Sequence, residues 1–359
     1  MCLVTFSWEK PDSVKKVEKF ELTQKVTWAH LELTDVCNLR CEWCYAGVEH
    51  GNKAFMSLDG IEKALIILAR SGVKQVTYAG GEPLIHPNIK EAVALAHNLG
   101  MVVHINSNGT FLTPELAVEL KKCGLSQIQI NLIALDEDLP KKILNGENAS
   151  EKVINALKNA KAADLITVAQ TVLTTENEDS ILEIIRYFRE NFKIDRVRVW
   201  DTTPSGAAIG KRELYPLNYP KTLEKITEYT ASLGATHVLS YEPFFPLQYE
   251  SPIAVTHVPC PSGEAMLIHV FVDFKVYFCC TMRGAYLYDL FDYENISELH
   301  KEKVMEYKTK FYGDSACNSC KFSGSCEKGC PTRASIEPNR IDYQCPTPVT
   351  ATKEASLIQ

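Results

Sequence analysis

Short apolar segments alternate with amphipathic segments from about residue 26 to residue 201. Leu58, Ile61, Leu65 and Leu68 recur at helical spacing and Gly72 follows them, which predicts a helix over 57–70. The same patterning predicts strands over 28–33, 75–78, 101–105, 128–135, 165–173 and 194–200. The other predicted helices cover 88–99 and 181–192, together with one between a Thr113 cap and Gly124 and one that Ser150 caps.

Six strand–helix units with short connections predict a parallel sheet, because a right-handed crossover returns the chain beside the previous strand. In the last strand, Val197 and Val199 alternate with Arg196 and Arg198, which predicts an edge strand with one face toward water. We therefore expect an α/β fold with an open, partial (β/α)6 barrel of the TIM type. Its site lies at the carboxyl ends of the strands, where the candidate pocket residues are Tyr78, Asn106, Gln129, Gln170, Trp200 and Asp201.

The pattern changes after Asp201. Residues 202–220 are rich in Pro, Gly and Tyr, a helix is predicted near 221–233, and a hairpin is predicted over 266–278. The Cys-, Gly- and Ser-rich run over 313–330 has too few apolar residues to bury a core, so metal–ligand bonds would have to stabilise it. We expect a barrel core over 26–205, a bridging region over 206–255 and a small cysteine-rich domain over 256–350.

Composition excludes several classes of protein. Of the 359 residues 45% are apolar and 23% are charged, which is typical of a globular chain. The longest apolar run, 64–69, is too short to span a membrane, and the N-terminus lacks the pattern of a secretory signal. The net charge of −7 argues against broad nucleic-acid binding. We expect a cytoplasmic protein that binds neither membrane nor nucleic acid.

Thirteen cysteines are many for such a chain, and they are clustered. In a reducing compartment, clustered cysteines bind metal more often than they form disulfides. Cys37, Cys41 and Cys44 follow the first predicted strand directly. Thiolates at this spacing can hold three corners of a cubane iron–sulfur cluster and leave one iron open. The alternative is a zinc site, which usually takes four ligands in paired spacing.

This Cx3CxxC motif, with the aromatic Tyr45 after it, resembles the signature of the radical S-adenosylmethionine (SAM) enzymes. Gly80-Gly81-Glu82-Pro83 resembles the GGEP motif that follows the second strand in that superfamily. The resemblance implies that SAM chelates the open iron of a [4Fe–4S] cluster. It places Gly80, Gly81 and Glu82 near the amino group of SAM, and Ser107 and Asn108 near its methionine or ribose part. Ala134 replaces a serine that relatives often carry, so Asn131 is the substitute candidate for the ribose contact.

The chemistry implied by the family is reductive cleavage of SAM to a 5′-deoxyadenosyl radical that abstracts hydrogen from the substrate. A flavodoxin- or ferredoxin-type protein would donate the electron. The motifs do not identify a general base, and no catalytic side chain is assigned.

The later cysteines resemble the SPASM extension of these enzymes, which usually binds two auxiliary [4Fe–4S] clusters. By this resemblance Cys317, Cys320, Cys326 and Cys345 hold the outer cluster, and Cys260, Cys279 and Cys330 hold the inner one. Cys280 is a candidate fourth ligand, with an open site as the alternative, and structural zinc is the rival to both clusters. Phe274 stands where the family pattern has glycine, so we expect Asp273 to help form the hairpin turn. Cys2 and Cys123 are expected to be ordinary thiols.

The resemblance leaves the substrate open. The SPASM group mostly modifies peptide and protein side chains, which makes a peptide or protein the first candidate substrate. Oxidation or rearrangement of a small molecule, such as a sugar or a cofactor precursor, is the alternative. A non-catalytic iron–sulfur electron carrier is the third hypothesis, and Cx3CxxC and GGEP have no purpose in it.

Overall fold

The computed structural model describes residues 26–47, 54–131, 149–192, 194, 196–216, 221–222, 225–226, 228–229, 238–240, 260–313, 315–320 and 329–337. Its strands are β1 (Trp28–Thr34), β2 (Gln75–Gly80), β3 (Val102–Ser107), β4 (Leu125–Asn131), β5 (Ile166–Leu173), β6 (Arg196–Asp201), β7 (Val238–Ser240), β8 (Leu267–Val270), β9 (Lys275–Tyr277) and β10 (Tyr286–Asp289). They form one sheet in the order β10-β9-β8-β1-β2-β3-β4-β5-β6-β7.

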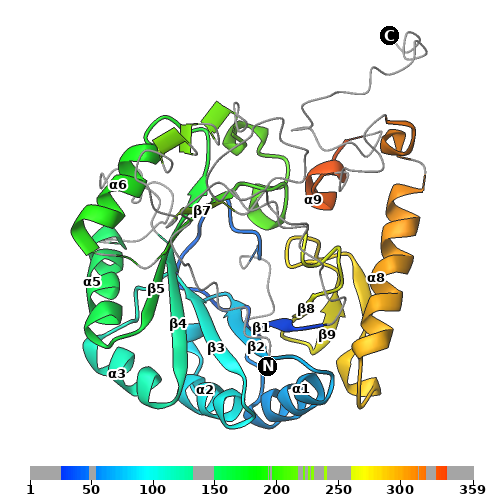
Figure 1. The fold of residues 1–359 in the computed structure, drawn as a ribbon, viewed down its shortest axis with the longest axis horizontal. Helices are drawn as coiled ribbons and strands as arrows, with labels where there is room; N and C mark the ends of the chain where they lie inside the picture. Colours follow the sequence, from blue (N-terminus) through cyan, green and yellow to red (C-terminus); the bar gives the residue numbers. More distant parts are fainter. Residues whose placement is uncertain are drawn as a thin grey trace, which may run out of the picture.

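The helices between these strands cover the outer side of the curved sheet (Figure 1). They are α1 (Leu58–Arg70), α2 (Ile89–Asn98), α3 (Pro114–Lys122), α5 (Ala149–Ala162) and α6 (Ile181–Phe192). The C-terminal part adds α8 (Ser297–Tyr312) and the short α9 (Pro331–Ala334). Single 3-10 turns lie at Pro83–Ile85, Gly206–Ala208, Arg212–Leu214, Leu290–Asp292 and Ala316–Ser319.

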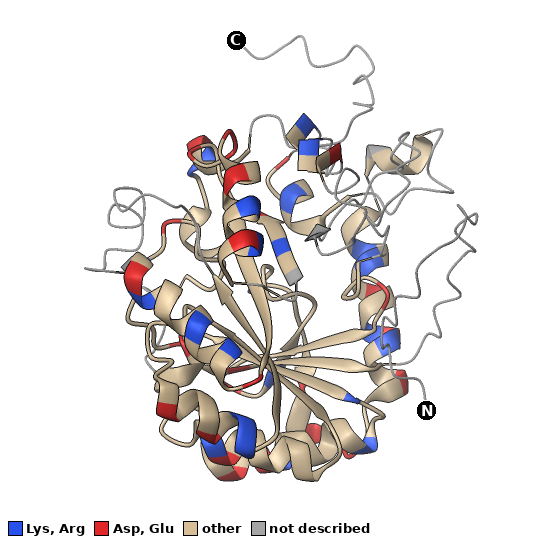
Figure 2. Cartoon of the chain, turned by 60° about the vertical axis from the view of Figure 1, so that its left-hand side comes forward, with Lys and Arg blue, Asp and Glu red and all other residues tan. Residues whose placement is uncertain are grey.

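The main apolar core lies between the sheet and these helices. Leu31 of β1, Leu65 of α1, Ile105 of β3 and Phe188 of α6 are all fully buried in it. Because side chains alternate along a strand, the neighbours of these core residues point to the inner face of the sheet. The outer helices carry Lys, Arg, Asp and Glu side by side (Figure 2). No helix in the described ranges is both long and apolar enough to cross a membrane.

Most helix boundaries follow the expected capping residues. Ser57 and Thr113 accept backbone N–H groups at the starts of α1 and α3, as Ncap side chains do. Gly72 and Gly124 take positive φ angles of 92° and 104° directly after these helices. The Ser150 cap was a wrong prediction, since α5 already begins at Ala149 and the buried Ser150 hydroxyl has no hydrogen-bond partner among the described residues. The predicted helix over 221–233 lies largely outside the described residues.

The sixth strand is not the edge of the sheet, contrary to the prediction. β7 pairs in parallel with β6 and continues the sheet beyond it. Arg198 alternates with Val197 and Val199 because its side chain points to the inner face, where its Nη1 donates to Gln129 Oε1 at 2.5 Å. A polar strand face can therefore line a sheet interior as well as meet solvent.

The predicted C-terminal hairpin forms, and it joins the barrel sheet. β8 pairs in parallel with β1 and antiparallel with β9, so the hairpin extends the sheet on the β1 side. In its turn Phe274 has φ +62°, while the Asp273 carboxylate accepts the N–H of Lys275 at 3.1 Å. Phe274 therefore takes the left-handed conformation that a glycine would take easily, and its ring stacks on Phe291 at 4.7 Å.

Candidate active site

The cysteine loop, residues 35–47, follows the carboxyl end of β1 and carries Cys37, Cys41 and Cys44 as free thiols. Its turn closes where the Cys41 carbonyl accepts the N–H of Cys44 at 3.1 Å. The Cys44 carbonyl in turn accepts the N–H groups of Gly47 and Ala207. Leu39 and Trp43 pack with Val172 of β5, and this small apolar cluster fixes the loop over the sheet.

The three thiols are suited to a metal cluster rather than to a single ion. Burial raises the pKa of Cys37 to about 11 and also raises the pKa of Cys41, so without metal both thiols stay protonated. Metal binding would displace these protons, as it does at other thiolate sites. Within the described ranges the three sulfur atoms do not gather closely enough to ligate one ion. This spacing disfavours a mononuclear zinc site at the loop.

The two glycines of GGEP bring β2 against the cysteine loop. The N–H of Gly81 donates to the Thr34 carbonyl at 2.6 Å, and that of Glu82 donates to the Val36 carbonyl at 2.8 Å. A Cβ on Gly80 would lie 2.2 Å from the Thr34 oxygen, and one on Gly81 would lie 2.1 Å from the Val36 oxygen. Because Gly80 and Gly81 have no side chain, the end of β2 can lie directly against Thr34 and Val36, just before Cys37.

Glu82 connects this turn to the end of β3. Its fully buried carboxylate accepts the Ser107 hydroxyl at 2.7 Å, the N–H of Asn108 at 2.7 Å and the N–H of Leu84 at 3.0 Å. Burial raises the pKa of Glu82 to about 7, against the opposing effect of these hydrogen bonds. The sequence suggested Glu82 as an acceptor for an ammonium group, and the structure shows its carboxylate engaged by the protein itself.

Asn108 links the third strand to the first cysteine. Its Nδ2 lies 3.8 Å from Cys37 Sγ and donates to Asn38 Oδ1 at 2.9 Å, while its Oδ1 accepts two hydrogen bonds from Thr110. Asn38 also donates to the Thr110 hydroxyl at 3.0 Å. Sequence reasoning missed Asn38 and Thr110, although Asn38 directly follows Cys37 and Thr110 lies two positions after Asn108.

Polar side chains fill the inner face of the sheet. Gln129 donates to Gln170 at 2.6 Å and accepts from Arg198, and Asn106 lies 3.3 Å from His30 Nε2. These residues were predicted as pocket candidates, apart from His30 and Arg198. Tyr78 was predicted wrongly, because its side chain is buried on the outer side and its hydroxyl donates to the Ala92 carbonyl of α2.

An ion pair between the buried Glu32 and the half-buried Arg283 lies near Tyr45. Arg283 Nη2 lies 2.8 Å from both carboxylate oxygens of Glu32 on β1, and its guanidinium sits 4.5 Å from the ring centroid of Phe271. Burial, together with the negative charge of Glu32, raises the pKa of Tyr45 well above its ordinary value. Tyr45 therefore keeps a neutral hydroxyl at the side of the cysteine loop that faces Cys280 and Arg283.

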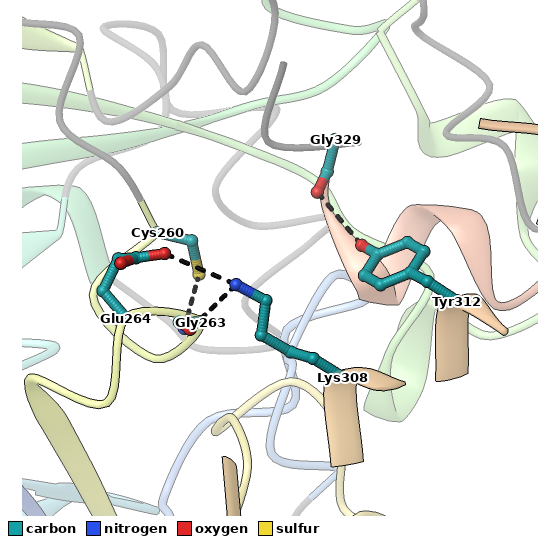
Figure 3. A network of polar contacts seen from close by, with 6 residues as sticks. All are labelled: Cys260, Gly263, Glu264, Lys308, Tyr312 and Gly329. Carbon is teal, nitrogen blue, oxygen red and sulfur yellow. Dashed lines mark hydrogen bonds and ion pairs between the residues drawn. The ribbon is translucent and has the colours of Figure 1, made fainter. Parts of the chain in front are cut away.

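The C-terminal cysteine segments are residues 260–265, 279–281, 315–320 and 329–331. Two side chains of helix α8, Lys308 and Tyr312, hydrogen-bond to the first and the last of these segments (Figure 3). Lys308 donates to the Gly263 carbonyl at 3.0 Å and pairs with Glu264 at 3.4 Å, next to Cys260, whose sulfur accepts the N–H of Gly263. One turn later in the helix, the Tyr312 hydroxyl donates to the Gly329 carbonyl beside Cys330.

Side chains also connect Cys279 to the segment of Cys330. Cys279 Sγ lies 3.2 Å from the Thr281 hydroxyl, which lies 2.6 Å from the hydroxyl of Thr332. Hydrogen bonds from the Cys280 thiol and from Thr281 lower the pKa of Cys279 to about 6, which favours its thiolate. The predicted ligands of the inner cluster therefore come from three segments that share one hydrogen-bonded neighbourhood.

The predicted outer ligands are described only in part. Cys317 and Cys320 lie on and directly after a 3-10 turn that Ser315 caps, with the Ser315 hydroxyl accepting the N–H of Cys317. Cys326 and Cys345 lie outside the described residues. A fully buried ion pair between Arg333 of α9 and Asp201 of β6, 2.5 Å apart, joins this part of the chain to the carboxyl end of the sheet.

Residues 31–188 match the family model described as the Radical SAM superfamily. The chain contains a radical SAM domain. This match covers the cysteine loop, the GGEP turn, Ser107, Asn108 and Asn131, all of which the radical SAM domain brings to the carboxyl ends of its first four strands. Members of this superfamily are enzymes.

Named relatives are similar over about half of the chain. The chain is 31% identical over 166 residues to a probable GTP 3′,8-cyclase of Pyrococcus horikoshii, covering 46% of this chain and 53% of that protein. It is 29% identical over 183 residues to a PqqA peptide cyclase of Bradyrhizobium diazoefficiens, covering 51% of this chain and 48% of that one. The chain thus spans about half the length of the curated relatives it matches.

Solved structures share the fold over most of the chain. Streptococcus suis SuiB bound to S-adenosylmethionine has a TM-score of 0.70 and 17% identity, covering 89% of this chain and 77% of SuiB. anSMEcpe with bound AdoMet has a TM-score of 0.66 and 17% identity, covering 89% of this chain and 92% of that one. The common feature is the α/β radical SAM fold, an open rather than closed barrel, which a cysteine-rich region follows here.

The residues present fit SAM and a cluster. The three free thiols lie on one loop, and Asn131 at the end of β4 has a buried Oδ1 without a hydrogen-bond partner in the described part of the chain. An orphaned buried acceptor costs free energy unless a ligand supplies a donor. Hydroxyl groups of a ribose are donors of that kind, which keeps Asn131 the candidate for the ribose contact.

Proposed function

We propose that this protein reductively cleaves SAM and uses the resulting radical to abstract hydrogen from a peptide or protein side chain. The observation that carries the proposal is the free Cys37, Cys41 and Cys44 thiols on a loop that Gly81, Glu82 and Asn108 fix to the two neighbouring strand ends. That arrangement belongs to a radical SAM domain by sequence match and has no use in a plain electron carrier.

Cys37, Cys41 and Cys44 would hold a [4Fe–4S] cluster that, with SAM bound, supplies a 5′-deoxyadenosyl radical for hydrogen abstraction. The chain itself positions the reactants and excludes water. The residues that would contact SAM next to the cysteine loop are Tyr45, Gly80, Gly81, Glu82, Ser107, Asn108 and Asn131. A flavodoxin- or ferredoxin-type protein in the cytoplasm would supply the electron.

We also propose that a SPASM-type region binds two auxiliary [4Fe–4S] clusters. Cys260, Cys279 and Cys330 would hold the inner one, a role that their shared neighbourhood and the lowered pKa of Cys279 support. Cys317, Cys320, Cys326 and Cys345 would hold the outer one. The scarcity of apolar residues in this part of the chain supports a stabilising role for the ligand bonds.

A peptide substrate is supported by the shared fold. SuiB bound to its precursor peptide SuiA superposes with a TM-score of 0.68, and anSMEcpe with AdoMet and the Cp18Cys peptide does so with 0.67. On the inner face, Asn106, Gln129 and Gln170 carry the amide groups that can pair with a peptide backbone. A small molecule is the second candidate, because the curated relatives include probable GTP 3′,8-cyclases.

The first experiment measures 5′-deoxyadenosine after anaerobic reconstitution of the full chain with iron and sulfide, followed by SAM and dithionite. We expect turnover in the native protein and in Cys123→Ser, which changes an ordinary thiol, and background only in Cys41→Ala. The proposal would be refuted if Cys41→Ala cleaved SAM at the native rate. It would also be refuted if neither the native protein nor Cys123→Ser cleaved SAM.

The substrate class is decided by hydrogen transfer. Deuterated GTP and a peptide pool from deuterated medium are supplied separately, and deuterium in 5′-deoxyadenosine is measured by mass spectrometry. Deuterium from the peptide pool supports the peptide proposal, and deuterium from GTP alone replaces it with the small-molecule alternative.

A further inference from the structure

Two histidines meet on the inner face of the sheet beside Cys280, the residue that is also the candidate fourth ligand of the inner auxiliary cluster. His30 of β1 and His269 of β8 are register partners in a parallel pair, and their rings meet edge to face with centroids 5.6 Å apart. The Cys280 thiol reaches the same place from the end of the hairpin. One ligand atom from each of the three residues lies within 4.8 Å of the others.

These histidines differ from the other buried histidines in their hydrogen bonds. In His86 both ring nitrogens are engaged, one by the Met56 carbonyl and one by the N–H of Asn88. In His300 both are also engaged, by the Tyr288 hydroxyl and the Leu267 carbonyl. These two histidines are thereby satisfied by the protein alone.

His30 and His269 each use only Nε2. His30 Nε2 lies 3.3 Å from the Asn106 side-chain amide, and His269 Nε2 lies 2.8 Å from the Ser262 hydroxyl. Their Nδ1 atoms are buried and have no hydrogen-bond partner in the described ranges. A buried nitrogen without a partner costs free energy, and two such atoms beside a thiol point to a common ligand.

Their second nitrogens are held as metal-binding histidines usually are. Such histidines commonly hydrogen-bond through the other ring N–H, which fixes the tautomer and the ring orientation. The Ser262 hydroxyl can accept from Nε2–H of His269. The Asn106 side-chain amide can accept from Nε2–H of His30 if the amide is flipped so that its oxygen faces the ring. The two orientations of an amide have nearly the same shape.

The charge states fit the same role. Burial lowers the pKa of His30 to about 4 and the pKa of His269 well below its ordinary value, so both imidazoles are neutral ligands at pH 7. The nearby Glu32 and Arg283 form an ion pair with each other, so neither adds a net charge beside His30, His269 and Cys280.

We propose that His30 Nδ1, His269 Nδ1 and Cys280 Sγ bind one divalent transition-metal ion of the zinc type. Two imidazoles and one thiolate are a ligand set that Zn²⁺ accepts, with a fourth position left for water or a substrate group. The ion would lie on the inner face, where it could polarise or orient a substrate bound to Asn106 and Gln129. The site is independent of SAM cleavage and of the peptide assignment.

The test uses the full chain with its iron–sulfur clusters reconstituted, dialysed anaerobically against a small excess of Zn²⁺ and then freed of loose metal. Zinc and iron per chain are measured by mass spectrometry, and the zinc ligands by X-ray absorption at the zinc edge. We expect about one zinc bound by nitrogen at about 2.0 Å and sulfur at about 2.3 Å, with the iron content unchanged.

His269→Gln and Cys280→Ser are the informative variants, because each removes one ligand atom. We expect both to lose the zinc and keep the iron. The controls His300→Gln and Cys123→Ser change a satisfied histidine and a distant thiol, and they should keep the zinc. Circular dichroism shows whether each variant folds. If Cys280→Ser does not fold, the zinc content of His269→Gln alone tests the proposal.

Three outcomes would overturn the proposal. The native protein could retain no zinc, or zinc could bind equally to folded His269→Gln and to the native chain. The third is uptake of zinc only as iron is lost, which would place the zinc at cluster cysteines. A loss of about four irons in Cys280→Ser, without zinc in the native protein, would instead make Cys280 an auxiliary-cluster ligand.

Discussion

The cysteine loop and the C-terminal cysteine segments are held by different kinds of contact. Backbone groups of Gly81 and Glu82 fix the loop to β2, so the register of the sheet itself sets its path. Side chains fix the C-terminal segments, through Lys308 and Tyr312 of α8 and through Thr332. A site built from backbone contacts is formed when the sheet forms, whereas one built from single side chains depends more on its ligand bonds.

The largest expected effect is a change in iron content that distinguishes the cysteine loop from the C-terminal cysteine segments. In a Cys37→Ala, Cys41→Ala, Cys44→Ala triple variant we expect about 12 irons per chain to fall to about 8, with SAM cleavage abolished. The C-terminal segments would keep their irons because no loop cysteine ligates them. Iron and acid-labile sulfide after anaerobic reconstitution measure this. A native content of about 4 irons with zinc present would instead make the C-terminal cysteines structural zinc ligands.

The backbone contacts of the loop are broken by Gly81→Ala. The added Cβ would lie 2.1 Å from the Val36 carbonyl oxygen, so the chain before Cys37 must move. We expect a loss of about 3 kcal/mol in the free energy of unfolding and a large loss of SAM cleavage. Urea unfolding and 5′-deoxyadenosine formation measure the two effects. Gly284→Ala is the matched control, since nothing lies within 4 Å of its Cβ position, and it should behave as native.

The attachment of the C-terminal part is broken by Arg333→Met. Its partner Asp201 is fully buried and would lose the guanidinium that faces its charge, so we expect a loss of about 3 to 5 kcal/mol. Arg212→Met removes the exposed pair with Glu337 and should cost less than about 1 kcal/mol. Urea unfolding compares the two. Equal losses would show that the buried pair does not hold α9 to the sheet.

The smallest expected effect is a pH dependence at Glu82. Its pKa is about 7 in the folded chain and 4.5 when unfolded, so between these values the folded protein binds one more proton. Stability therefore falls as pH rises through this window, by at most about 3 kcal/mol from this group. Urea unfolding of the ligand-free chain from pH 4.5 to 7.5 should show a flatter profile for Glu82→Gln. Parallel profiles would assign the slope to other groups.

Local rules predicted much of the fold. The strands β1, β2, β3 and β5, and the helices α1, α2, α3 and α6, form within a few residues of the expected positions. They do so because apolar periodicity and caps such as Ser57 and Thr113 act over single turns. β4 begins at Leu125, earlier than predicted, because the polar Ser126 and Gln127 interrupt the apolar pattern at its start.

Long-range pairing could not be predicted in this way. The pairing of β8 with β1 joins residues more than two hundred positions apart, and no local pattern encodes such a neighbour. The roles of Glu82 and Arg198 were missed for the same reason: each depends on a partner from another strand. His30 and His269 are unremarkable in sequence, and only their shared register makes them a pair.

The sequence by itself determined the parallel order of the barrel units, the radical SAM motif and the cysteines available for clusters, because these depend on spacing along the chain. The tertiary structure decided that GGEP faces the cysteine loop, that Asp201 meets Arg333 and that Cys280 meets two histidines. Those contacts arise from the curvature and register of one ten-stranded sheet, which brings distant strand ends within hydrogen-bond distance.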